Sequence, residues 1–83
     1  MSHDIRFAEY FVVVRDDDQE IVASTKTLEW AEAVRDAAER DTGEAHRCLP
    51  ATQELAENFT DWAWRTETIE RDGIPTELAV IDR

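Results

Sequence analysis

The stretch TQELAENFTDWAWRTETIER, residues 52–71, decides the fold of this chain, because its pattern fits both a helix and a strand. The strand interpretation is based on the threonines and tryptophans and on the dipeptide DG, which would join WRTETIER and ELAVID into a hairpin. The helix interpretation is based on spacing, because side chains that can face a core recur at helical intervals at Leu55, Phe59, Trp62, Thr66 and Ile69.

Charge pairs and stop signals favour the helix in this stretch. Asp61 and Arg65 would form an i,i+4 pair with the acid on the N-terminal side, and Glu67 and Arg71 would form a second. The sequence DGIP is typical of a helix end that leads into a strand. We therefore predict a helix here, although the threonines lower its propensity and packing must compensate.

The helix interpretation separates the two neighbouring tryptophans. Trp62 joins the core stripe, whereas Trp64 lies on the opposite, acidic face, where a large aromatic side chain can anchor an interface. Packing of Trp64 against a neighbouring loop, or an incidental exposed position, are the alternatives. The partner-binding residues that we predict are Trp64, Glu57, Asp61 and Glu67.

The N-terminal part of the chain predicts two strands. Residues Ile5–Arg15 and Glu20–Thr25 are dense in β-branched and aromatic residues, and DDDQ between them reads as a hairpin loop. Adjacent aspartates in a tight turn cannot all face one cation, so we predict no metal site there. We expect residues 1–4 to be mobile.

A helical period begins after Thr27, which is a plausible N-cap, and ends near Gly43 at the C′ position. One face of this helix collects the residues predicted to meet the core, namely Trp30, Ala33, Val34, Ala37 and Ala38.

The segment EAHRCLP predicts one short strand that Pro50 stops, with His46 and Cys48 on the same side. A structural zinc site needs four ligands, and the chain offers no second pair at suitable spacing. We predict that Cys48 is a small buried side chain.

The order strand, strand, helix, strand, helix, strand predicts an α+β domain that occupies residues 1–83. The expected architecture is a two-layer sandwich of ββαβαβ order, in which both helices cover one face of a three- to four-stranded sheet.

Charge excludes several classes of function. The chain has 20 Asp and Glu against 9 Lys and Arg, and its formal net charge is −11. Such a field repels phosphate backbones and anionic membranes, so we expect neither nucleic acid nor membrane as a direct ligand. No stretch resembles a secretory signal or a membrane span, and the single cysteine fits the cytoplasm, where we place the protein.

Chemical motifs are also missing from the sequence. It has no Gly-rich phosphate loop, nucleophile elbow or HExxH spacing, so we predict no catalytic residue, cofactor or metal ligand. The expected function is a small acidic, non-catalytic interaction or regulatory module that binds a basic protein. The alternatives are a nucleic-acid-mimicking inhibitor, for example a virus-encoded one, and a homodimeric protein whose acidity is an adaptation to salt.

Overall fold

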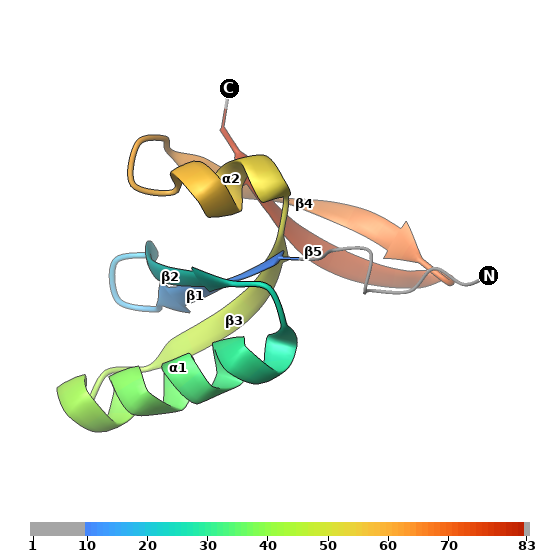
Figure 1. The fold of residues 1–83 in the computed structure, drawn as a ribbon. Helices are drawn as coiled ribbons and strands as arrows, with labels where there is room; N and C mark the ends of the chain where they lie inside the picture. The colour runs from blue at the N-terminus through green and yellow to red at the C-terminus, as the bar shows by residue number, and fades with distance from the viewer. Residues whose placement is uncertain (1–9, 83) are drawn as a thin grey trace.

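A five-stranded mixed sheet forms the centre of the computed structural model, which describes residues 10–82 (Figure 1). The strand order is β2-β1-β3-β5-β4, with β3 and β5 parallel and the other neighbours antiparallel. The elements are β1 (Tyr10–Arg15), β2 (Glu20–Thr25), α1 (Leu28–Thr42), β3 (His46–Ala51), α2 (Gln53–Asn58), β4 (Trp64–Arg71) and β5 (Ile74–Ile81).

The predicted α+β class is confirmed, but the predicted ββαβαβ order and the three- to four-stranded sheet are not. The order is ββαβαββ, because one predicted helix is divided between a short helix and a strand. The predictions for residues 1–4, and for a strand that starts at Ile5, lie outside the described residues.

Strand β1 lies at the centre of the core. Its residues Val12, Val13 and Val14 are completely buried, because β2 and β3 flank the strand and a helix covers each of its faces. Full burial of one such side chain contributes about 1.5–3 kcal/mol. A continuous apolar run, rather than an alternating one, is the pattern of a strand buried on both faces.

The prediction that both helices cover one face of the sheet is wrong. Ala31 of α1 packs with Phe11 and Val13, whereas Leu55 of α2 packs with Val12 and Val14. Successive residues of a strand point to opposite faces, so these contacts place the helices on opposite sides (Figure 1). The sheet is therefore the middle of three layers.

The helix predicted across residues 52–71 is also wrong for its second half. Helix α2 covers only Gln53–Asn58, and residues 64–71 form β4 instead. Leu55 is buried and Phe59 packs against the same core cluster, so the first half of the predicted stripe is real. Beyond Phe59 the helical spacing is coincidental, because residues 64–71 pair with β5 as an antiparallel strand.

A long hairpin of β4 and β5 extends from the body of the sheet (Figure 1). Asp72 and Gly73 form its turn with φ values of 53° and 78°. Positive φ at both central residues is the mark of the type I′ turn, which matches the twist of a two-residue hairpin. The predicted pair of Asp61 with Arg65 is replaced by an ion pair of Arg65 with Glu67 on the same face of the strand, at 2.8 Å. The predicted pair of Glu67 with Arg71 involves a side chain outside the described part of the structure.

The predicted ends of α1 are confirmed. The Thr27 hydroxyl accepts a hydrogen bond from the Trp30 N–H at 3.1 Å, and Gly43, with φ of 74°, donates its N–H to Glu39 O at 2.8 Å. The predicted core face is right for Val34, which packs against the cluster of Phe11 and Val13, and wrong for Trp30. Ala31 is fully buried, while the Trp30 side chain is 66% exposed.

Strand β3 continues through Pro50 to Ala51 instead of stopping at the proline. The Thr52 N–H donates to Ala79 O on β5, so the nitrogen of Pro50, two residues earlier, also faces β5. Proline has no N–H to donate. The pairing of β3 with β5 is accordingly confined to Ala51 and Ala79.

Candidate functional site

The four predicted partner-binding residues do not form one surface. Glu57 lies on the exposed side of α2, Asp61 in the loop after it, and Trp64 and Glu67 on β4. Glu67 and Trp64 are an odd number of residues apart on one strand, so their side chains lie on opposite faces of the sheet. The predicted helical patch does not exist.

Trp64 belongs to the core rather than to an exposed helix face. Its ring is partly buried and packs against the cluster of Val12, Val14 and Leu55. The indole N–H donates to Gln19 O at 3.0 Å, across 45 positions of sequence. Trp64 therefore links the start of β4 to the loop between β1 and β2.

Trp62 takes the exposed position that the sequence analysis assigned to Trp64. Its side chain is 52% exposed and lies in the loop between α2 and β4. The prediction that Trp62 is a core residue is wrong, because this segment is not helical and the stripe that included Trp62 does not form.

A groove of about 470 Å³ lies beside Trp62, between the β1–β2 loop and the α2–β4 loop. Aromatic and polar side chains share its walls. The lining residues are Asp18, Gln19, Glu20, Ile21, Phe59, Thr60, Trp62 and Trp64. We call this feature the Trp62 groove.

Arg15 fixes the acidic wall of the groove. Its guanidinium contacts Asp18 at 2.9 and 3.1 Å and Glu20 at 2.9 Å. The hydrogen bond from Arg15 lowers the pKa of the Asp18 carboxyl to about 2. Hydrogen bonding and the charge of Asp18 in turn raise the pKa of Arg15. Both carboxylates are held in place, and that of Asp18 is ionised at neutral pH.

Arg47 fixes the same loop from β3. Its guanidinium donates to Asp16 Oδ1 at 3.0 Å and to the side-chain oxygen of Gln19 at 2.7 Å. Gln19 itself has a φ of 57°, and its side-chain amide donates to Asp16 O. The predicted DDDQ hairpin loop is therefore confirmed, and its shape is maintained by two arginines.

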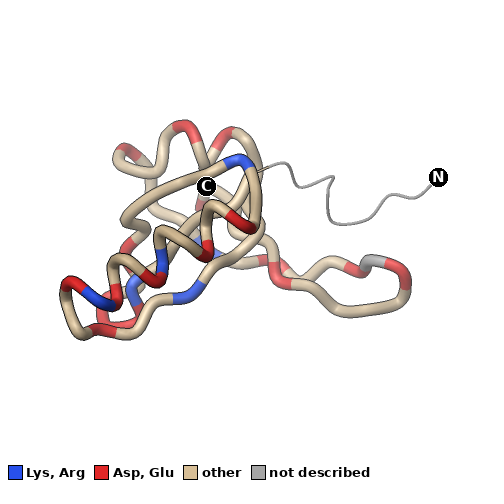
Figure 2. Tube along the Cα trace, turned by 60° about the horizontal axis from the view of Figure 1, so that its bottom comes forward, with Lys and Arg blue, Asp and Glu red and all other residues tan. Residues whose placement is uncertain are grey.

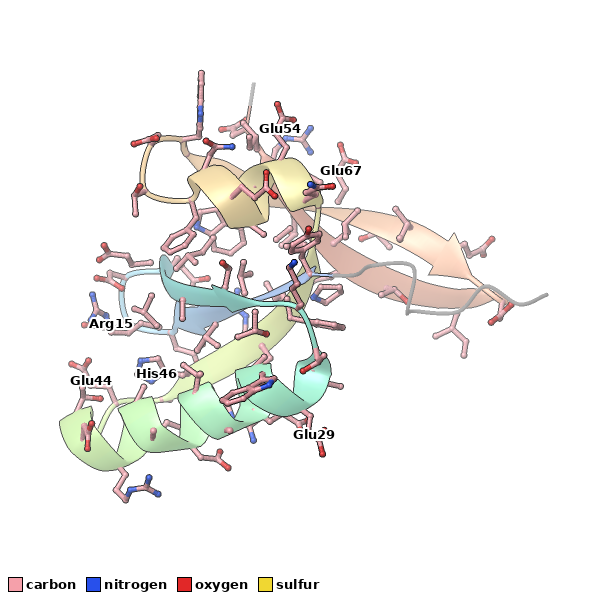
Figure 3. The ribbon with its side chains drawn as sticks, in the orientation of Figure 1. Arg15, Glu29, Glu44, His46, Glu54 and Glu67 are labelled. Atoms are coloured by element: carbon pink, nitrogen blue, oxygen red, sulfur yellow. The ribbon has the colours of Figure 1, made fainter. Side chains whose placement is uncertain are left out.

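His46 and Cys48 lie on the same face of β3, as predicted. The ring of His46 is buried and its Nδ1 is 2.8 Å from Glu44 O, while its backbone N–H donates to Glu39 Oε2. Figure 3 shows Glu44, His46 and Arg15 gathered at one end of the molecule. Cys48 is half-buried against α1, and desolvation raises the pKa of its thiol.

This end of the molecule has the contacts of a structural junction between α1 and β3. Within residues 10–82, no group of three or more His, Cys, Asp or Glu side chains is arranged to hold a metal ion.

A second exposed aromatic side chain lies on α1. Trp30, together with Glu29 and Ala33, lines a hollow of about 350 Å³. It belongs to a different part of the molecule from the Trp62 groove, and it provides a matched reference for experiments on Trp62.

The sequence does not reveal Asp18 and Glu20 as neighbours of Trp62, whereas Phe59 was already expected to lie near it. In the sequence, the groove corresponds only to a loop rich in aspartate and to a group of aromatic residues some 40 positions later. No local pattern indicates that these two segments lie side by side. The connection depends on the long-range hydrogen bond of Trp64.

Among residues 10–82, no helix is long and apolar enough to cross a membrane. We compared the chain with models of known protein families, with curated proteins and with solved structures, and none of these comparisons found a match.

Proposed function

We propose that the chain is a non-catalytic interaction module whose Trp62 groove binds a basic segment of a partner protein. The observation that carries the proposal is the groove itself, whose lining combines the exposed indole of Trp62 with the acidic side chains of Asp18 and Glu20. This combination fits a lysine or arginine side chain, whose apolar stem and charged end need different surroundings.

Each wall of the groove contributes a distinct interaction with such a side chain. The face of an indole attracts a cation placed within about 6 Å, and the gain is about 0.5–2 kcal/mol. Arg15 contacts both oxygens of Asp18 but only Oε1 of Glu20. The second oxygen of Glu20, and the further lone pairs of the Asp18 oxygens, can accept hydrogen bonds from a bound cation. Because Arg15 and Arg47 already hold the loop, binding needs little ordering of it.

The charge of the whole chain supports a basic partner. A net charge of −11 attracts cationic surfaces over a distance and raises the rate of encounter. The acidic residues are spread over helices, loops and the hairpin, with arginines between them (Figure 2). Mimicry of a nucleic acid calls for a continuous row of carboxylates, so this distribution favours a local binding site over mimicry.

Binding of an oligolysine peptide, followed by isothermal titration calorimetry, tests the proposal. We expect Trp62→Ala to weaken binding about tenfold, because the exposed ring supplies the apolar and cation–π contacts. Trp30→Ala removes an indole on α1 that is even more exposed than Trp62, and it should leave the affinity unchanged.

Two further experiments distinguish binding in the groove from attraction by the overall charge of the chain. Oligoglutamate of the same length should not bind. Asp18→Asn should weaken binding more than Asp41→Asn, which removes an equal charge at the end of α1. Equal losses for Trp62→Ala and Trp30→Ala would show that only the overall charge attracts the peptide.

A further inference from the structure

The two outer strands of the sheet differ in how their edges are protected. Between Val13 and Val14 of β1, the register with β2 shifts by one residue, and the extra residue is Val22. Bulges of this kind twist an edge away from further pairing. β4, at the other edge, runs for 8 residues with unbroken register against β5. Of the two edges, only β4 is a regular template for another strand.

The backbone groups of β4 that face outward can be identified from one hydrogen bond. The Asp82 N–H donates to Ala63 O at 2.9 Å, so the backbone of Ala63 faces the β5 side. Backbone direction alternates along a strand. Trp64, Thr66, Thr68 and Glu70 therefore direct their N–H and C=O groups outward, where β4 has no neighbouring strand among residues 10–82.

Strand β4 has no net formal charge, although the chain as a whole is strongly acidic. Its sequence WRTETIER carries two arginines and two glutamates. The chain as a whole has a formal charge of −11 and repels its own copies. The edge of β4 is thus a place where a second copy can approach without a local excess of negative charge.

We propose that two copies of this chain pair through β4, antiparallel and centred on Thr66, so that two five-stranded sheets join into one. A two-fold axis perpendicular to the sheet brings Thr66 opposite its own copy. Arg65 then lies opposite the partner's Glu67, and the partner's Arg65 lies opposite Glu67. Trp64 and Thr68, whose backbone groups also face outward, pair on either side of the centre.

Charges disfavour the neighbouring registers. A centre at Glu67 places two glutamates opposite each other, and a centre at Thr68 places Arg65 opposite the partner's Arg71. Like charges directly opposite each other destabilise a strand pair. A centre at Ile69 avoids like charges, but it brings fewer outward-facing residues opposite one another than the centre at Thr66 does.

Sedimentation equilibrium of the full chain tests the pairing. The monomer mass is 9.6 kDa, and we expect the mass to double with rising protein concentration. Glu67→Arg brings arginines opposite each other twice in the dimer, so the dissociation constant should rise roughly tenfold or more. The exchange Arg65→Glu with Glu67→Arg restores opposite charges and should restore the dimer.

Glu77→Arg is the matched control. It makes the same change of charge in the same hairpin, but on the inner strand β5, opposite Thr68. The dimer should persist in this variant, and circular dichroism should show that every variant is folded. A chain that stays monomeric at all concentrations would overturn the proposal. So would a dimer that Glu67→Arg leaves intact, or one that the exchange fails to restore.

This inference does not depend on the Trp62 groove. A monomer that binds oligolysine would reject the β4 pairing alone, and a dimer that binds no oligolysine would reject the groove alone. If both hold, the dimer presents two grooves, and a partner with two basic segments would bind with higher avidity than either segment separately.

Discussion

Trp64 stabilises the molecule by closing one end of the core. Its ring packs against the cluster around Leu55, and its N–H satisfies Gln19 O at 3.0 Å. Removal of the ring leaves a cavity beside the core cluster and breaks the hydrogen bond to the β1–β2 loop.

We therefore expect Trp64→Ala to lower the free energy of unfolding by about 3 kcal/mol, whereas Trp62→Ala should lower it by less than about 1 kcal/mol. Urea unfolding followed by circular dichroism measures both values. A larger loss for Trp62→Ala than for Trp64→Ala would contradict the placement of the two rings.

Asp18 makes the stability of the β1–β2 loop dependent on pH. Arg15 lowers the pKa of Asp18 from 3.8 to about 2 in the folded chain, so the ionised carboxylate favours the folded state. Its contribution is present above about pH 3.8 and is lost as the pH falls towards 2.

The stability difference between the natural chain and Asp18→Asn should consequently shrink as the pH is lowered from 5 to 2 in urea unfolding experiments. Asp17→Asn is the control, because the described contacts of Arg15 go to Asp18, Glu20 and Glu44. A difference that stays constant over this range would show that the ion pair does not form in solution.

Helix α1 shows that the rotational phase of a helix decides which residues reach the core. Ala31 lies at full burial against Phe11 and Val13, while Ala33, on the other side, is exposed beside Trp30. The close approach of α1 to the sheet depends on the small size of Ala31.

Ala31→Leu should destabilise the chain by about 1–3 kcal/mol through overpacking, and Ala33→Leu should change stability by less than about 0.5 kcal/mol. Thermal or chemical unfolding of the two variants provides the comparison. Equal effects would mean that α1 is rotated relative to the structure.

Helix ends that are fixed by a single capping residue were predictable from the sequence. Thr27 and Gly43 end α1 because their own side chain and conformation satisfy the helix termini. Residues 64–71 were ambiguous, because the DG signal for a hairpin, which the structure confirms, competed with a helical stripe. Leu55 and Phe59 begin a true helical stripe, and Trp62, Thr66 and Ile69 continue it by coincidence. Only the pairing of Trp64 with Ile81 and its neighbours selects the strand, and that contact is not local.

The candidate site was less predictable than the fold, because its walls come from distant parts of the chain. Residues 18–21 and residues 59–64 meet only when the sheet brings the β1–β2 loop beside the start of β4. Sequence analysis recognised that one of the two neighbouring tryptophans is a surface residue. The exposed residue was predicted to be Trp64, but it is Trp62. The two rings exchange places because residues 64–71 form a strand instead of a helix.

At the scale of the whole molecule, the net charge of −11 opposes folding through repulsion among the carboxylates. Added potassium chloride should raise the midpoint of thermal unfolding, because it screens repulsion among the carboxylates. The same salt should weaken oligolysine binding. A midpoint that falls with salt would show that attractive surface pairs, such as Arg47 with Asp16, outweigh the repulsion.

The central claim is that the Trp62 groove receives a cationic side chain, and nuclear magnetic resonance of the three indole N–H groups tests it most directly. The resonances can be assigned by replacing each tryptophan with phenylalanine. On addition of oligolysine, the account predicts a large saturable shift for Trp62, a smaller one for Trp64 and none for Trp30. A shift of Trp30 equal to that of Trp62, or no saturable shift of Trp62, would contradict it.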